Sequence, residues 1–430
     1  MIKTLWSGPN NKQWGALGLS ASIIIVLQRE GGFYCPKFLV EKAGIIIIFL
    51  SLIVTLIMAD CDFKTNPKAH TLLTACLVIF LICAIIIFLT DRFILFYVFF
   101  EFSIIPMMFL VSSSGYSLER ALAIMYMYVY TVVFSLPALL ASSFLIFYTG
   151  APILFRQAPH TEQLCKSPLL TSLVVLMFVM KMPIWGFHFW LPKAHVEASV
   201  QGSMLLASVV LKFGVYGLVK VVSLGLVLTH EDQSHGLLVG LSAMGVILIS
   251  FLCMRQVDNK AAVAISSIVH MGPCLLLIFS ASNICLEATA LIMLAHGLVS
   301  PAMFLFIHKV YETNKSRRII LRSGVLKANI AAQTFWFLVC CTNMGLPITM
   351  NFMGEVKFFY LIYSFNVAIF ALLLLGILIR GLYNVLLFNF LNSKAPADNT
   401  LTVSLPQTLK KATAVVLISV LFYIVIDIEL

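Results

Sequence analysis

The sequence predicts an all-α polytopic membrane protein, on three observations. Of its 430 residues, 61% are hydrophobic and only 11% are charged, whereas about 25% are charged in an ordinary soluble domain. The mean hydropathy is +1.03, so apolar residues dominate along the chain. The apolar runs have the length of membrane-spanning helices and do not show the alternating strands of a membrane β-barrel.

About thirteen apolar runs can cross a bilayer core, which needs roughly 20 helical residues. The first run follows Lys3 and Lys12 as in a signal peptide, but Gln28-Arg29-Glu30 replaces the small residues of a cleavage site, so we interpret it as a membrane helix. The predicted spans are 14–28, 43–59, 71–89, 93–112, 121–148, 168–191, 199–228, 236–253, 260–282, 286–308, 330–362, 365–390 and 412–428.

These spans form one predicted membrane domain over residues 1–428. We expect amino-terminal helices in 1–70, a first five-helix repeat in 71–228, a second in 236–392 and a carboxy-terminal helix in 412–430. Lys and Arg are more numerous in the amino-terminal segment and every second loop than in the loops between them. The positive-inside rule therefore places the amino terminus inside and, with an odd span count, the carboxyl terminus outside.

Composition and motifs exclude several functions. The net charge of +10 does not indicate nucleic-acid binding, because the basic residues stand in short gaps between apolar runs. The ten cysteines include no C-x-x-C and no spacing typical of a zinc or iron–sulfur site. The sequence also lacks a phosphate-binding loop and a dinucleotide fingerprint. We therefore expect no metal or cofactor site, and any energy for transport must come from elsewhere.

Four spans carry a titratable residue near their middle: Glu101, Lys212, His270 and His296. A charge at the bilayer centre costs about 2.5–3.5 kcal/mol even on the most lenient scale, so residues of this kind need a reason to persist. Lys220 lies nearer to a span end, where its stem can extend toward the headgroups, and it is a weaker candidate.

Two spans are interrupted as well as charged. Lys181 is followed by Pro183 and Gly186, and Glu355 is preceded by a Gly-Leu-Pro sequence that starts at Gly345. Broken, charged helices at matching places in two halves are typical of transporters built from inverted repeats, with an ion site near mid-membrane. The two broken spans are an odd number of spans apart, which predicts opposite topologies for the two units.

The titratable residues within the predicted spans are of types that suit proton transfer. Desolvation favours the neutral form of a buried lysine and a nearby carboxylate favours its charged form, so neutralising Glu101 would release a proton from Lys181. The alternative is structural: Glu101, Lys181, Lys212 and Glu355 would form static ion pairs, and the two histidines would be hydrogen-bonded core residues.

A further polar cluster follows the first break. Its members are His188, Lys193, His195 and Glu197. Two interpretations remain open: a proton relay to Lys212, or an interfacial turn with its charges among the headgroups and with two tryptophans as anchors.

Seven sequence motifs carry a family resemblance. They are Phe96–Pro106, Met180–Ala198, Gly202–Met204, Leu211–Gly214, Ile265–Met271, Ala295–Leu298 and Asn351–Glu355. Together they resemble the antiporter-like membrane subunits of mitochondrial NADH:ubiquinone oxidoreductase (complex I), and among these the chain 4 proteins. The resemblance extends from about residue 43 onward.

The resemblance implies a proton-translocating subunit with two inverted five-helix repeats, each with one discontinuous helix. By this resemblance, Glu101 is the acidic partner of the first half-channel and Lys181 is its titrating lysine. Lys212 links the two halves, and Glu355 is the acidic exit residue. The protein would then act as a subunit of NADH:ubiquinone reductase (H+-translocating), without a redox site of its own.

The resemblance also places His270 and His296 on the polar axis between the halves. It implies that NADH, FMN, the iron–sulfur clusters and ubiquinone bind in other subunits, while this chain contacts lipids such as cardiolipin. The implied partners are other membrane-arm subunits, especially antiporter-like chains 2 and 5, and accessory subunits, with no nucleic acid. The implied location is the mitochondrial inner membrane, with the amino terminus in the matrix and the carboxyl terminus in the intermembrane space.

The sequence also departs from the family pattern. Only a short segment precedes the second family helix, so the first is predicted to be missing. Ser199, Gln201 and Ile348 stand where the family usually has Pro, Ala and Pro. Two other functions stay open: a subunit of a multi-subunit sodium/proton antiporter, which shares the fold and the lysines, and a structural membrane scaffold.

Overall fold

The computed structural model describes residues 36–59, 67–112, 118–149, 168–223, 233–279, 283–314, 316–318, 330–347, 349–365 and 367–392. The predicted spans 14–28 and 412–428 lie outside these residues. Within the described ranges every named element is a helix, and one isolated β-bridge joins Asp258 to Arg318. The predicted all-α class is therefore confirmed for this part of the chain.

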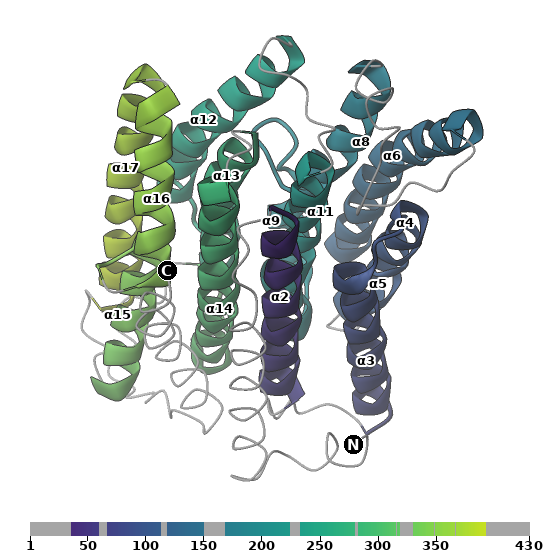
Figure 1. Cartoon of the computed structure of the whole chain (residues 1–430). Helices are drawn as coiled ribbons and strands as arrows, with labels where there is room; N and C mark the ends of the chain where they lie inside the picture. Colours follow the sequence, from purple (N-terminus) through teal and green to yellow (C-terminus); the bar gives the residue numbers. More distant parts are fainter. Residues whose placement is uncertain are drawn as a thin grey trace.

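The helices run side by side as a bundle (Figure 1). In chain order they are α2 (Pro36–Ala59), α3 (Pro67–Leu89), α4 (Phe93–Phe102), α5 (Ile104–Ser112), α6 (Leu118–Thr149), α8 (Pro168–Lys181), α9 (Trp190–Glu197), α10 (Val200–Leu205), η2 (Leu206–Val210), α11 (Leu211–Ser223), α12 (Gln233–Met254), α13 (Asn259–Phe279), α14 (Asn283–Asn314), α15 (Ile330–Met344), α16 (Met350–Phe365) and α17 (Val367–Asn392).

Eight helical stretches among the described residues are long and apolar enough to cross a membrane. Three shorter apolar helices, Ala43–Met58, Leu169–Lys181 and Ile330–Met344, accompany them. The last two belong to the spans that the sequence predicts to be interrupted. The chain is thus a multi-pass membrane protein.

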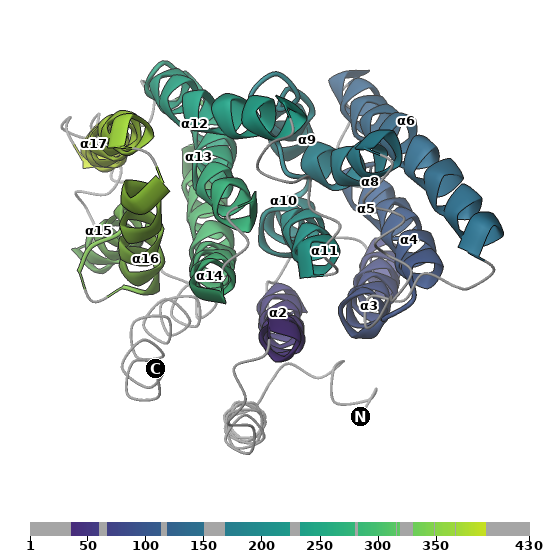
Figure 2. The same ribbon diagram turned by 45° about the horizontal axis from the view of Figure 1, so that its top comes forward.

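Three stretches form the centre of the bundle. Among 18 consecutive residues of each of Val200–Val222, Asn259–Phe279 and Ile284–Glu312, 94% are buried, compared with 28% for Glu119–Phe144 and 33% for Val367–Asn392. Figure 2 shows α10, α11, α13 and α14 between α6 at one end and α17 at the other. The outer helices expose large apolar side chains to their surroundings, as lipid-facing helices do.

Two glycines let α11 approach α8 closely. A Cβ atom at Gly214 would lie 3.0 Å from the carbonyl oxygen of Phe178, and one at Gly217 would overlap the Phe178 ring. Membrane helices commonly use small residues for such close contacts, because lipid provides no hydrophobic force between them. The approach brings together the two helices that carry Lys181 and Lys212.

Both predicted helix breaks are present. Helix α8 ends at Lys181 and the chain turns until α9 begins at Trp190, with Gly186 at a φ of +93°. Helix α15 ends at Met344 and α16 begins at Met350, with Gly345 at a φ of +81°. Glycine adopts these positive φ values without a steric penalty, and the nearby prolines cannot donate a helical hydrogen bond.

Two other interruptions were not predicted. The span 93–112 divides at Ser103 into α4 and α5, and the span 199–228 contains the π-helical turn η2. Short π-helical turns often occur at functional sites. Here the turn ends at Val210, two residues before Lys212.

Candidate functional site

Lys181 stands at the end of the first broken helix and is 3% exposed. Its Nζ donates to the carbonyl oxygen of Phe100 at 3.5 Å and lies 3.6 Å from the centre of the Phe100 ring. The neighbouring carboxylate of Glu101 on α4 interacts with Lys181 electrostatically. The Oε1 atom of Glu101 is buried without a hydrogen-bond partner among the described residues. The predicted acid and base therefore interact electrostatically through space, from two different helices.

A small cavity of about 10 Å³ lies beside Lys181, close to the lower limit for holding one water molecule. Its lining surface is apolar, and its lining residues include Ser103, Thr131 of α6, and Leu206 and Val210 of η2. The cavity therefore lies between the first break and the π-helical turn that precedes Lys212.

Lys212 is fully buried at the start of α11. Its Nζ donates to the carbonyl oxygen of Ala207 in η2 at 2.6 Å and lies 2.9 Å from Nδ1 of His296. An ammonium group can only donate, so Nδ1 accepts when Lys212 is charged; a neutral amine can instead accept from a protonated imidazole. The proton in this contact can thus be bound to either Lys212 or His296.

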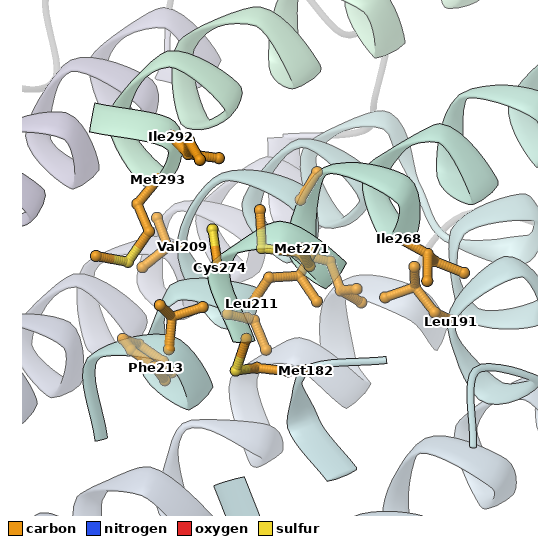
Figure 3. Close-up of a cluster of buried hydrophobic side chains, with 14 of the residues drawn as sticks. Met182, Leu191, Val209, Leu211, Phe213, Ile268, Met271, Cys274, Ile292 and Met293 are labelled. Atoms are coloured by element: carbon orange, nitrogen blue, oxygen red, sulfur yellow. The ribbon is translucent and has the colours of Figure 1, made fainter. Parts of the chain in front are cut away.

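His296 on α14 and His270 on α13 are the next buried polar residues after Lys212. Their ring centres are 5.4 Å apart, and both side chains are 1% exposed. Figure 3 shows buried apolar side chains of this region, among them Leu211 and Met271, which in the sequence are next to Lys212 and His270. In such surroundings polar interactions are strengthened, and an unpaired polar group becomes costly.

Arg380 joins His270 to the second broken helix. Its Nη1 lies 3.5 Å from His270 Nδ1, and its Nη2 donates to the Glu355 carboxylate and, at 3.4 Å, to the carbonyl oxygen of Met344. The predicted residues Lys212, His296, His270 and Glu355 therefore form one continuous polar row, in which Arg380 is an additional member. Arg380 was not among the site residues predicted from the sequence.

Three amides fix the helices around the second break. Asn343 donates to the Asn384 side chain at 2.9 Å, and Asn384 donates to the Arg380 carbonyl at 3.0 Å. Asn351 donates to the Thr342 carbonyl at 3.0 Å. These uncharged residues were also absent from the predicted site, which consists of titratable residues only.

Of the polar cluster after the first break, His195 lies nearest to the row. It is fully buried, its ring stacks on Phe304 with 4.7 Å between ring centres, and it interacts electrostatically with both Lys212 and His296. Neither of its ring nitrogens has a hydrogen-bond partner among the described residues.

The other members of this cluster lie elsewhere. His188 stacks between Trp185 and Phe189. Lys193 is exposed and lies over the Tyr126 ring, 3.8 Å from its centre, and Glu197 pairs with Arg317 at 3.3 Å. Trp190, one of the two tryptophans of the interfacial interpretation, is 1% exposed and faces the protein interior.

Lys220 and Ser199 have local structural roles. Lys220 donates to the Thr90 carbonyl just beyond the end of α3, and it is 4% exposed, so other parts of the chain cover its stem. Ser199 accepts from the Gly202 amide at 3.1 Å as the N-cap of α10 and donates to the Leu110 carbonyl at 2.9 Å. Within the described ranges, no group of three His, Cys, Asp or Glu side chains is placed to hold a metal ion.

Comparisons with known proteins identify the family. The profile described as "NADH:quinone oxidoreductase/Mrp antiporter, TM" matches residues 90–380. The NADH-ubiquinone oxidoreductase chain 4 of Paracentrotus lividus is 34% identical over 362 residues, which cover 82% of this chain and 76% of the relative. That of Myxine glutinosa is 32% identical over 355 residues, which cover 81% and 76%.

Solved structures share the fold. A chain of respiratory complex I from Thermus thermophilus superposes with a TM-score of 0.75 at 20% identity, over 97% of this chain and 91% of that one. A chain of the Mrp complex from Dietzia sp. DQ12-45-1b gives 0.74 at 17% identity, over 89% and 42%. The profile match over most of the sequence, together with the identity to the relatives, shows that the chain belongs to the NADH:quinone oxidoreductase/Mrp antiporter membrane family, together with the NADH-ubiquinone oxidoreductase chain 4 proteins.

Proposed function

We propose that this chain is the antiporter-like, proton-translocating chain 4 subunit of the membrane arm of respiratory complex I. It would couple NADH oxidation and ubiquinone reduction in other subunits to proton movement. The observation that carries the proposal is the buried polar row from Lys212 through His296, His270 and Arg380 to Glu355, which joins the centre of the bundle to the second broken helix.

The proposed roles follow the order of these residues. Glu101 controls whether Lys181 holds its proton, because the carboxylate favours the charged amine that burial disfavours. Lys212 then exchanges a proton with His296 across their 2.9 Å contact, and Glu355 is the last acid of the row. Each proton moved outward works against about 2.3 kcal/mol per 100 mV of membrane potential.

We also propose that His195 belongs to this path. Its burial and its position near Lys212 and His296 support a relay role. His188 and Lys193 make no contact of this kind, so any part that they take would be at the entry of the path.

The wider architecture is part of the same proposal. Ten of thirteen spans would form two inverted five-helix repeats, 71–228 and 236–392, and each repeat would contain one of the two observed breaks. The chain would lie in the mitochondrial inner membrane with its amino terminus in the matrix. Its neighbours would be antiporter-like chains 2 and 5, accessory subunits and lipids such as cardiolipin, while NADH, FMN, the iron–sulfur clusters and ubiquinone would bind in other subunits.

Lysine variants of the full chain test this proposal. Lys181→Met and Lys212→Met should assemble, as judged by native gel electrophoresis with an NADH-oxidation stain and mass spectrometry of the active band. Both should lose proton pumping. Lys357→Met is the matched control, because it removes another intramembrane lysine, whose ion pair with Glu287 at 3.1 Å lies outside the row. Normal pumping in both test variants would instead favour a structural scaffold.

A second candidate is a subunit of a multi-subunit sodium/proton antiporter. The family profile covers Mrp antiporters, and the fold superposes on a chain of the Mrp complex. Proton-coupled sodium movement by a smaller assembly that has no NADH-oxidising activity would favour this function over the first.

A further inference from the structure

Arg380 is a buried cation in the wall of the second helix break. It lies on α17, is 3% exposed, and reaches groups on three other helices. These are His270 on α13, Glu355 on α16 and the terminal carbonyl of α15 at Met344. A single side chain thus spans the interruption between α15 and α16.

The contacts suit a guanidinium group rather than a simple ammonium. Its planar fork presents several donors at fixed angles, so one arginine can hold a carboxylate, a carbonyl and a ring nitrogen together. The backbone of Arg380 is fixed as well, because Asn384 donates to its carbonyl and is itself held by Asn343. Lys357, two residues beyond Glu355, pairs with Glu287 instead.

Arg380 interrupts the row chemically. A guanidinium stays protonated in proteins, so it can neither accept a proton from His270 nor give one to Glu355. Two atoms beside it are buried without hydrogen-bond partners among the described residues: Nε2 of His270 and Oε1 of Glu355. A proton must therefore pass around the guanidinium.

We propose that Arg380 is a positioning residue that holds Glu355 in its carboxylate form and controls when this group takes up a proton. Transfer occurs when the guanidinium moves off the carboxylate. His270 is neutral while its Nδ1 accepts from Arg380, and once the guanidinium has moved away this nitrogen takes up a proton from the row. The imidazolium then gives the proton on its Nε2 to Oε1 of Glu355, which leaves a neutral imidazole and a neutral carboxylic acid. Arg380 keeps all its protons throughout.

The control of proton transfer rests on the proposed function, whereas the ionised state of Glu355 does not. Infrared spectroscopy of the assembled protein in membranes can measure that state directly, through the C=O stretch of a protonated carboxyl group. The signal of Glu355 is assigned by its loss in a Glu355→Gln background.

The native protein should show no protonated-carboxyl signal from Glu355 at neutral pH. Arg380→Met and Arg380→Gln should each gain this signal, and the double variants with Glu355→Gln should lose it again. Arg380→Lys should restore the carboxylate, because it returns a positive charge. The matched control Lys357→Met, which breaks the other ion pair of α16, should leave Glu355 ionised.

Two neutral variants are included because removal of one partner from a buried ion pair is strongly destabilising. If Arg380→Met fails to assemble, Arg380→Gln still removes the charge while keeping hydrogen-bond donors for Met344 and His270. A carboxylate that stays ionised in the assembled neutral variant would overturn the inference. This result differs from a failure of the proposed function, which would appear as normal pumping in Lys181→Met and Lys212→Met.

Discussion

Single contacts decide the chemistry of this protein. Lys212 depends on two acceptors, the Ala207 carbonyl and the His296 ring. The surroundings are apolar, so a lost partner cannot be replaced by bulk water. The proton-holding and the structural roles of His296 can therefore be separated by substitution.

We expect His296→Gln and His296→Phe to separate these roles. A glutamine can still accept from Lys212 but does not titrate at neutral pH, so pumping should fall at least about tenfold while assembly persists. A phenylalanine also leaves Lys212 without its side-chain partner, which should cost a further ~1–3 kcal/mol of stability. Proton pumping by reconstituted complexes and thermal inactivation measure the two effects.

Substitution of Ser300 on the same helix, Ser300→Ala, is the control for this pair and should leave both measurements near the native values. Native pumping in His296→Gln would show that the ring acts only as a hydrogen-bond acceptor.

The sequence predicted the titratable residues of the row better than their connections. Lys212, His270 and His296 were found because charge near the middle of an apolar span is costly. Arg380 was not assigned, although it also lies within a span. Its partner Glu355 is 25 residues away on another helix, and the rotation of one helix against another is not encoded in a local pattern.

At the scale of helices, breaks caused by proline and glycine were predictable and the π-helical turn was not. The positions around Pro183 and Gly345 interrupt helices as expected. The segment Leu206–Val210 contains neither proline nor glycine. Its widened turn places the Ala207 carbonyl against Lys212. Packing against other helices, rather than a local sequence signal, accounts for this turn.

The two positive-φ glycines should respond differently to alanine. Both Gly186→Ala and Gly345→Ala should lose about 1–3 kcal/mol of stability through backbone strain. A Cβ atom at Gly186 would meet nothing within 4 Å, but one at Gly345 would lie 2.9 Å from Oε2 of Glu355. Only Gly345→Ala should therefore disturb the pair between Arg380 and Glu355, as measured by the infrared signal of that carboxyl group. Equal signals in the two variants would contradict this expectation.

The close contact between α8 and α11 gives a second prediction at this scale. Gly217→Ala should separate these helices, because its Cβ would overlap the Phe178 ring, and overpacking costs about 1–3 kcal/mol. The yield of assembled protein after mild heating is the measurement. Gly240→Ala, where a Cβ meets nothing within 4 Å, is the control. The double variant Gly217→Ala with Phe178→Leu should recover part of the loss, and no recovery would indicate that Phe178 is not the obstacle.

For the whole molecule, the most buried helices carry three members of the polar row. The central stretches have mean hydropathies of 1.9 to 2.1, which fall within the 1.8 to 3.3 of the outer stretches. Hydropathy therefore did not show which helices are central. Three mid-span titratable residues did: Lys212, His270 and His296 lie on the three stretches with the largest share of buried residues. Arg380 is buried as well, on the inward-facing side of the outer helix α17.

This arrangement predicts that the two ends of the path act in series. Lys181→Met should block the path at α8, and Glu355→Gln should block it at α16. If one path joins them, each single variant should lose pumping, and the double variant should lose no more than the slower single variant. Two separate routes would each carry a share of the protons, so each single variant would keep the share of the other route and the two losses would add in the double variant. The comparison uses the proton-pumping rate per NADH oxidised, with the Lys357→Met variant as a reference for assembly. Partial losses that add would show that Lys181 and Glu355 serve separate routes and that the row between Lys212 and Glu355 does not carry protons from the first broken helix.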